Sequence, residues 1–177
     1  MGAIGLPGPL RLSPAFPFAG RARELGTLGA LLPRAKGEGG RTALVTGEPG
    51  SGKSRLVREL AQRLSADGVT VLYGACDAVV PAPYRPFVEA LEPLVRDADP
   101  DTLRVRLGPG GRDLARLLPF LHAVVGDETA PTTADADTDR HRLHTAVGDL
   151  VAAAAERTPV LLVLEDIHWA DSPTLLL

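Results

Sequence analysis

The sequence predicts an α/β protein in which helices cover a parallel sheet, and three short runs indicate the strands. Residues 42–46 read TALVT and enter a glycine-rich loop that leads into a helix. Residues 69–73 are again rich in β-branched and aromatic side chains, and residues 160–164, VLLVL, are apolar at every position. Strands that alternate with helices are typical of α/β folds, and a wholly apolar strand is expected where both faces of a parallel sheet are covered.

The composition is that of a folded chain, and it argues against two classes of partner. The 177 residues are 45% hydrophobic and 23% charged, which suits one domain with a real core. The net charge of -3 offers no basic surface to nucleic acid. No run of about 18 apolar residues predicts a membrane span, and residues 1–12 lack the basic start of a signal peptide. We therefore expect a cytoplasmic protein that contacts neither nucleic acid nor membrane through this segment.

Residues 1–17 are expected to form a flexible leader, and residues 18–177 form the domain itself. Four prolines among small residues oppose regular structure in the leader. From Arg21 onward, apolar side chains recur at helical spacing until Pro33, which predicts a helix that stops there. A flexible turn over residues 37–41 then leads to the first strand.

The middle of the chain predicts three further helices. The first follows the glycine-rich loop as an amphipathic segment that ends near Asp67, and the second covers residues 87–95. Leucines between positions 114 and 121 predict the third, which Pro119 kinks or divides. The single cysteine, Cys76, lies beside the second strand and is interpreted as a small buried hydrophobic residue.

The last third of the chain begins with a predicted mobile loop at residues 126–139, which are rich in Asp, Thr and Ala and show no apolar period. Residues 143–154 then predict a long helix that closes near Pro159. After the apolar strand, Asp171 followed by Ser172 and Pro173 has the form of a helix cap with proline at the first helical position.

Residues 47–54 read GEPGSGKS and satisfy the phosphate-loop pattern G-x-x-x-x-G-K-[ST], with a predicted strand before it and a helix after it. Phosphate oxygens need several donors within a small radius, and backbone N–H groups at a helix N-terminus provide them. Gly50 and Gly52 permit the close approach of the backbone. Lys53 is expected to reach the β- and γ-phosphates, and the Ser54 hydroxyl to coordinate Mg²⁺. ATP is the expected ligand.

Glu165 and Asp166 follow the apolar strand at its carboxyl end, where parallel α/β sheets bind ligands. A P-loop enzyme needs an acidic group here for the metal and a further group that orients water. Neighbouring strand residues point to opposite faces, so both acids can serve one site only if the chain is already turning at the strand's exit. The residues alone leave the two roles open.

Four stretches in this order resemble one known domain type: FAGRAREL at 18–25, GEPGSGKSRLV at 47–57, YRPFVEAL at 84–91 and LVLEDIHWAD at 162–171. Together they resemble the AAA-like, signal-transducing ATPase domain at the front of large ATP-binding LuxR-type transcriptional regulators of actinobacteria. The same domain type also precedes adenylate cyclases and protein kinases. The resemblance covers nearly everything from Phe18 onward and implies a three-layer P-loop NTPase sandwich.

The resemblance also implies residue roles. It places Gly20 and Arg21 near the adenine and ribose, assigns Glu165 to the metal and assigns Asp166 to the attacking water. Hydrolysing relatives more commonly have Asp before Glu, so the inverted pair favours slow switching over efficient turnover. The nucleotide contacts expected from the motif and the resemblance are Gly20, Arg21, Gly47, Glu48, Pro49, Gly50, Ser51, Gly52, Lys53, Ser54 and Arg55. His168 and Trp169 are interpreted as packing groups.

These features predict an Mg-ATP-binding nucleotide-switch module of a signal-transducing ATPase, namely the regulatory ATPase region of a LuxR-type regulator. The alternatives are a free-standing ATP hydrolase, the ATPase module of an adenylate cyclase or protein kinase, and an inert truncated fragment. Self-association through the ATPase domain of the full-length protein is a further expectation.

The resemblance implies that the sandwich is incomplete in this chain. The family places a further strand, later in sequence, between the strands at 42–46 and 160–164, and the sequence ends at Leu177. We therefore expect either a gap between those two strands or their direct pairing. Unpaired strand edges associate readily, so poor solubility and weak hydrolysis are also expected.

Overall fold

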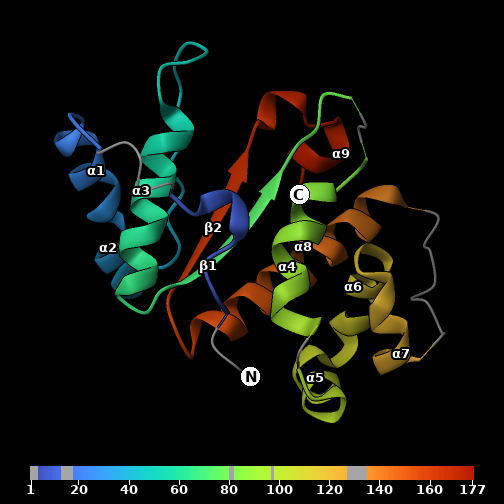
Figure 1. The fold of residues 1–177 in the computed structure, drawn as a ribbon. Coiled ribbons are helices and arrows are strands. Elements are labelled where there is room, and N and C mark those ends of the chain that lie inside the picture. Colours follow the sequence, from blue (N-terminus) through green and yellow to red (C-terminus); the bar gives the residue numbers. More distant parts are fainter. Residues whose placement is uncertain (1–3, 13–17, 80–81, 97, 127–134) are drawn as a thin grey trace.

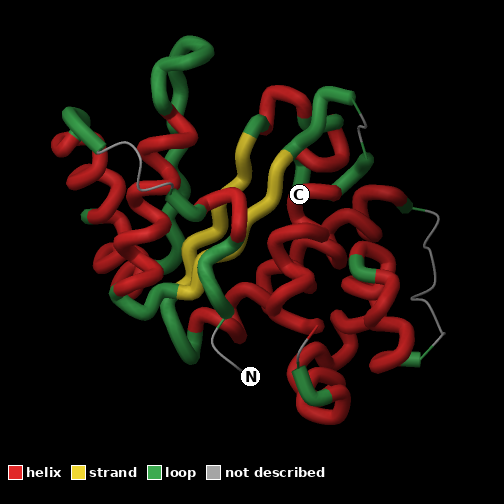
Figure 2. Tube along the Cα trace, in the orientation of Figure 1, coloured by secondary structure: helices red, strands yellow, loops and turns green. Residues whose placement is uncertain are grey.

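The computed structural model describes residues 4–12, 18–79, 82–96, 98–126 and 135–177. Within these residues two parallel strands, β1 (Thr70–Ala75) and β2 (Val160–Glu165), form the single sheet. Their register pairs Thr70 with Val160 and Ala75 with Glu165. Figures 1 and 2 show helices on both sides of the two strands. The second and third predicted strands therefore form, and they give the predicted α/β arrangement with a parallel sheet.

One face of the sheet is covered by α3 (Lys53–Ala66), the helix that follows the glycine-rich loop. Side chains alternate between the two faces of a strand, so every second residue of β1 and β2 packs here. The cluster beneath α3 consists of Val57, Ala61, Val71, Tyr73, Leu161 and Val163, together with Leu6 and Leu10.

The opposite face packs against α4 (Arg85–Arg96) and α8 (Ala136–Ala155) and belongs to the main core. Leu72 is fully buried there, and Leu162 and Leu164 of β2 pack against the same cluster. The close contact of β1 with α4 requires glycine at position 74, because a Cβ there would lie 1.8 Å from the carbonyl oxygen of Pro86.

The prediction that both faces of β2 are fully covered is wrong in degree. Of its six residues only Val163 is buried, and the others are half-buried. The reason is that the described part of the chain pairs β2 with β1 along one edge only, so the other edge adds no neighbouring side chains.

The first predicted strand does not form. Residues 42–46 lie outside the sheet without regular structure, and the Leu44 side chain is 70% exposed. A run of five residues is a strand only where a neighbour completes its hydrogen bonds, and none of the described strands lies beside it. These residues therefore do not pair directly with β2, and the sheet contains no strand leading into the loop.

The N-terminal residues form η1 (Gly8–Leu10), α1 (Ala22–Gly29) and α2 (Leu31–Glu38). Leu10 lies in the segment predicted to be a loose leader, yet it is fully buried between α3 and the sheet. The predicted helix stop at Pro33 is also wrong. Pro33 occupies the third position of α2, where a backbone N–H has no intrahelical partner to lose, so the helix continues.

The region between α4 and the long helix is helical. It contains α5 (Pro100–Leu107), η2 (Gly108–Gly110), α6 (Gly111–Leu117), η3 (Pro119–Leu121) and α7 (His122–Val125). As predicted, Pro119 divides its helix, since α6 ends before it and η3 begins at it. The sequence analysis did not predict α5, which Asp99 caps by accepting a hydrogen bond from the Thr102 N–H at 2.9 Å.

The mobile loop predicted at 126–139 is partly replaced by helix. Residues 127–134 lie outside the described residues, but α8 begins at Ala136 with Asp135 as its cap, which accepts from the Asp137 N–H at 3.1 Å. Acidic residues are favoured in the first turn of a helix, so the aspartates mark its start. Beyond β2, η4 (Ile167–Trp169) and α9 (Ser172–Leu175) follow, and Asp171 caps α9 as predicted.

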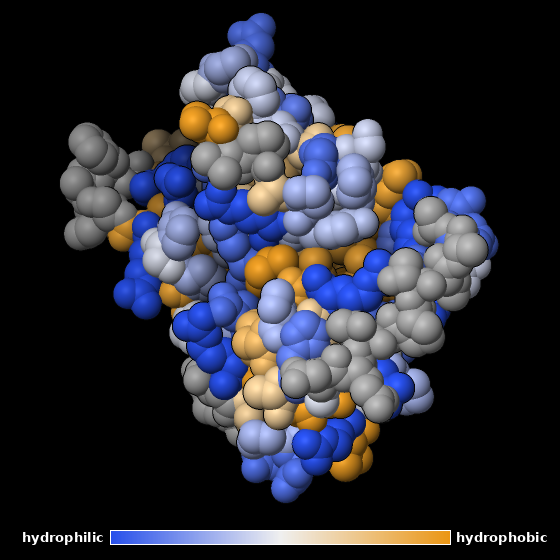
Figure 3. All heavy atoms as spheres, turned by 90° about the vertical axis from the view of Figure 1, so that its right-hand side faces the viewer, coloured by the Kyte–Doolittle hydropathy of each residue, from blue (hydrophilic) through white to orange (hydrophobic). Residues whose placement is uncertain are grey.

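Two charge pairs join α6 to α8. Arg142 lies 3.2 Å from Asp113, and Arg116 lies 3.4 Å from Asp139, and both carboxylates are buried. Figure 3 shows hydrophilic and hydrophobic side chains interspersed over the face that carries these helices. No helix in the described parts of the chain is long and apolar enough to cross a membrane.

Candidate functional site

The glycine-rich loop lies at the end of the molecule to which both strands point. Figure 1 shows the N-terminus of α3 and the carboxyl ends of β1 and β2 on the same side. In parallel α/β proteins this is the side on which ligands bind. The structure therefore brings the two motifs found in the sequence, residues 47–54 and the pair Glu165 and Asp166, to one side of the fold.

The loop takes a backbone shape that depends on glycine. Gly50 has φ of 74° and Gly52 has φ of 85°, values that side chains on an L-residue oppose. Gly52 precedes the first residue of α3, and the Ser51 N–H donates to the Glu48 carbonyl at 3.1 Å to close a turn. The first N–H groups of a helix have no carbonyl partner within it, so the start of this 14-residue helix supplies the kind of donor that an anion needs.

Lys53 is held against the loop. Its Nζ donates to the carbonyl oxygens of Gly47 at 2.9 Å and Glu48 at 3.0 Å. Both carbonyls belong to the first residues of the loop, so the ammonium closes the loop from its helical end. A positive charge is thereby fixed beside the backbone donors.

Arg21 also reaches the loop. The residue has a left-handed backbone with φ of 53°, directly after Gly20 with φ of 75°, and its guanidinium donates to the Ser51 carbonyl. Two segments that the sequence analysis linked only by resemblance are therefore in contact. The expected proximity of Gly20 and Arg21 to the adenine and ribose stays a prediction.

Ser54 lies on the side of α3 that faces the sheet. It precedes Val57 by three residues and Ala61 by seven, a spacing that places all three on one helix face. Val57 and Ala61 pack into the cluster on the sheet, whereas Ser54 is exposed at the open end of the helix. Its hydroxyl is thus available at the boundary between α3 and the ends of the strands.

Glu165 belongs to the same face of the sheet. It continues the alternation of Leu161 and Val163, and its Oε2 accepts a hydrogen bond from the hydroxyl of Tyr73 at 2.9 Å. Its Oε1 is buried and has no hydrogen-bond partner among the described residues. A carboxylate oxygen withdrawn from water without a partner is costly, which marks this atom as one that a ligand would satisfy.

These residues fit a magnesium ion. Mg²⁺ binds oxygen ligands and keeps several waters, so it needs only one or two protein groups beside the phosphates of a nucleotide. The Ser54 hydroxyl and the Glu165 carboxylate supply such oxygens from the two layers that meet at the site. Glu165 Oε1, buried and unpaired in the described structure, is the observation that supports the fit.

Asp166 lies just beyond the end of β2. Its backbone is left-handed with φ of 57°, it precedes η4, and its carbonyl accepts from the Trp169 N–H at 2.9 Å. The chain therefore turns at the strand's exit, the condition under which both acids can serve one site. Asp166 is exposed, whereas Glu165 is half-buried.

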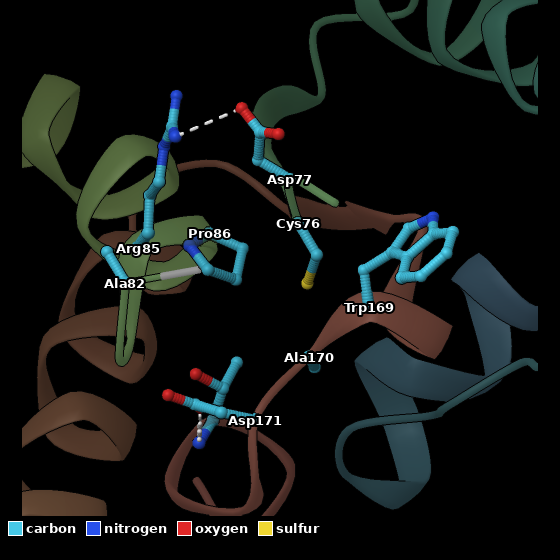
Figure 4. Close-up of a pocket in the computed structure, with 9 residues that line it drawn as sticks. Cys76, Asp77, Ala82, Arg85, Pro86, Trp169, Ala170 and Asp171 are labelled. Carbon is cyan, nitrogen blue, oxygen red and sulfur yellow. Dashed lines mark hydrogen bonds and ion pairs between the residues drawn. The ribbon is translucent and has the colours of Figure 1, made fainter. Parts of the chain in front are cut away.

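A small pocket lies beside this turn, away from the phosphate loop. Figure 4 shows Cys76, Arg85, Trp169 and Asp171 around it, with Arg85 paired to Asp77 at 3.3 Å. Burial, followed by the nearby carboxylates, raises the pKa of the Cys76 thiol. This direction favours the protonated thiol, but Cys76 is half-buried and not the fully buried residue that the sequence predicted.

Sequence reasoning missed one residue of the site, Tyr73. Tyr73 was interpreted only as part of a β-rich run, yet its hydroxyl donates a hydrogen bond to Glu165. The available signal was a tyrosine among aliphatic strand residues, because a buried tyrosine hydroxyl usually has a hydrogen-bond partner. Identifying that partner required the register of β1 with β2.

The chain is similar to known proteins over most of its length. Residues 17–177 match the family model described as AAA ATPase domain. An uncharacterized protein of Rhizobium meliloti (strain 1021) is 28% identical over 172 residues, which cover 88% of this chain and 16% of the relative. The chain thus spans only a small part of that relative's length. No solved structure matches the chain.

Proposed function

Since the chain belongs to the AAA ATPase domain family, we propose that it is an Mg-ATP-binding module that acts as a nucleotide switch within a longer signal-transducing protein. One observation carries the proposal. The phosphate loop at the start of α3 and the half-buried Glu165 at the end of β2 lie on the same side of the fold, and Glu165 has a carboxylate oxygen without a hydrogen-bond partner in the described structure.

In this proposal the backbone N–H groups of residues 47–54 bind the β- and γ-phosphates, and Lys53 neutralises them. Ser54 and Glu165 hold Mg²⁺ directly or through water. Asp166, exposed at the turn, orients the water of a slow hydrolysis. The chemistry is electrostatic stabilisation of charge on the phosphates, which the bound metal reinforces.

The proposal of a module within a longer protein is supported by the length of the Rhizobium relative, because the matched residues cover only 16% of that relative. The proposed host is a LuxR-type regulator, on the strength of the four sequence stretches that resemble that group. In it the module would work in the cytoplasm, self-associate through the ATPase domain and leave DNA contact to another region.

A nucleotide titration tests the proposal. Fluorescent ATP and ADP analogues should bind in the presence of Mg²⁺, whereas a fluorescent adenosine without phosphates should not, since the loop recognises phosphates. A phosphate-release assay on the same samples separates the switch from a free-standing hydrolase. Tight binding with slow release supports the switch, rapid turnover supports the hydrolase, and equal binding of adenosine and ATP analogues refutes a phosphate site.

A further inference from the structure

Tyr73 and Glu165 are cross-strand neighbours on the face of the sheet that α3 covers. The register pairs Tyr73 with Val163 and Ala75 with Glu165, so Tyr73 lies diagonally across from Glu165 on the same face. Diagonal neighbours in a sheet lie within reach of a long aromatic side chain. The hydroxyl donates to Glu165 Oε2 at 2.9 Å, and it is the one side-chain hydrogen bond to this carboxylate in the described structure.

Tyr73 is partly enclosed by α3. Tyr73 is half-buried and packs with Val57 and Ala61 of α3. Burial is the main cause that raises the pKa of its phenol, and the hydrogen bond and negative charge of Glu165 raise it further. The positive charge of Arg58 on α3 acts in the opposite direction but does not reverse the shift. An ordinary tyrosine hydroxyl already carries its proton at neutral pH, so the donation to Glu165 does not depend on this shift.

The hydrogen bond makes the two oxygens of Glu165 unequal. Oε2 is occupied by Tyr73, whereas Oε1 is buried and without a hydrogen-bond partner in the described part of the chain. A carboxylate fixed at one oxygen cannot rotate freely, so the other oxygen keeps one orientation. Groups that hold a metal-binding carboxylate in this way raise metal affinity without touching the metal.

We propose that Tyr73 is a positioning residue, which fixes the Glu165 carboxylate through Oε2 so that Oε1 serves the Mg²⁺ shell of the bound nucleotide. The inference rests on the proposed function, because it requires that nucleotide and Mg²⁺ bind at this site. It adds a residue from β1 to a site that the sequence motifs assign to the loop, α3 and β2 alone.

The test compares nucleotide binding over a series of Mg²⁺ concentrations in the full chain. The protein has two tyrosines, which offers a matched pair of variants. Tyr73→Phe removes the hydroxyl and keeps the ring, and Tyr84→Phe removes the same atom at the start of α4, outside the cluster beneath α3. A fluorescent ADP analogue is the probe, first in excess chelator and then with added Mg²⁺.

In chelator, the parent and both variants should bind ADP equally, because the phosphate loop is unchanged. Tyr73→Phe should need roughly ten- to hundredfold more Mg²⁺ for half-maximal tightening, whereas Tyr84→Phe should match the parent. In a Glu165→Ala background, adding Tyr73→Phe should change nothing further, because the hydroxyl then has no carboxylate to hold. Glu165→Asp keeps the charge but withdraws the carboxylate from Tyr73. It should show the same increase in the Mg²⁺ concentration needed for half-maximal tightening, and it replaces Tyr73→Phe if that variant does not fold.

An unchanged Mg²⁺ dependence in Tyr73→Phe, or a further loss when it is added to Glu165→Ala, overturns the positioning role while leaving the nucleotide site intact. Failure of the parent protein to bind ADP at any Mg²⁺ concentration overturns the proposed function and this inference with it. The two failures are therefore distinguishable in one set of titrations.

Discussion

At the scale of single residues, the site depends on charges that the fold holds in place. Lys53 is tied to the first carbonyls of the loop, and Arg21 is tied to the Ser51 carbonyl. Glu165 is tied to Tyr73. Groups fixed before a ligand arrives lose little freedom on binding, which favours affinity.

Lys53→Ala is expected to abolish detectable ATP binding, because the ammonium supplies the side-chain charge for the terminal phosphates. The fold should remain intact, since the ammonium of Lys53 donates its hydrogen bonds to two carbonyls of an exposed loop. Calorimetry on the variant and the parent measures the effect. Lys36→Ala is the matched control, because Lys36 is exposed on α2 and is the other of the chain's two lysines. Equal ATP affinity in Lys53→Ala and the parent would contradict the site.

Glu165→Ala is expected to weaken the Mg²⁺ dependence of nucleotide affinity, since it removes the carboxylate that is proposed to serve the metal. Chelation should lower the nucleotide affinity of the parent and have little effect on the variant. Nucleotide titrations with and without chelator measure both. If affinity of the parent is unchanged in excess chelator, the site does not use a metal.

At the scale of elements, the position of the acid pair depends on how α4 and α3 hold the two strands. The contact of β1 with α4 is tight enough to exclude any side chain at position 74. Leu161 and Val163 of β2 pack in one cluster with Val57 and Ala61 of α3, so Glu165, two residues beyond Val163, lies on the sheet face that α3 covers. A shift of either helix would therefore move the strands relative to the loop.

Gly74→Ala is expected to destabilise the protein by about 1–3 kcal/mol or more, because its Cβ would lie 1.8 Å from the Pro86 carbonyl oxygen and the backbone of α4 must move. Gly148→Ala is the control, since a Cβ at this position of α8 meets nothing within 4 Å and alanine favours a helix. Urea unfolding of both variants measures the free energies. Equal stabilities in the two variants would show that α4 does not pack on β1 in this way.

At the scale of the whole molecule, the N-terminal segment packs beneath α3, and residues 42–46 lie outside the sheet. Leu10 is fully buried between α3 and the sheet, whereas Leu44 is 70% exposed. This is the reverse of the sequence prediction, in which a loose leader precedes a strand of the sheet. Replacing each leucine by alanine distinguishes the observed arrangement from the predicted one.

Leu10→Ala is expected to lower the free energy of unfolding by about 2–5 kcal/mol, the usual cost of removing a buried leucine. Leu44→Ala should change it by less than about 0.5 kcal/mol, as exposed positions do. Thermal or urea unfolding of the two variants checks the pair. A neutral Leu10→Ala together with a destabilising Leu44→Ala would restore the predicted strand and leader.

The sequence by itself determined the features that depend on local chemistry. The phosphate loop follows from the spacing of Gly47, Gly52 and Lys53, and the start of α9 follows from Asp171 as its cap. The helices α3 and α4 follow from their apolar period, and the division at Pro119 follows from the geometry of proline. Each depends on residues within a few turns of one another, so a short window of sequence is sufficient.

The tertiary structure alone decided the features that depend on partners distant in the chain. Residues 42–46 have the composition of a strand, but no strand of the described structure pairs with them. Leu10 lies in a proline-rich stretch, which predicts a loose segment, yet its side chain packs beneath α3. Tyr73 meets Glu165 across 92 positions of sequence. The pairing of two strands, the burial of a leucine and a hydrogen bond between strands all require surfaces that the fold brings together. Their free energies therefore do not appear in the local pattern of the residues that share them.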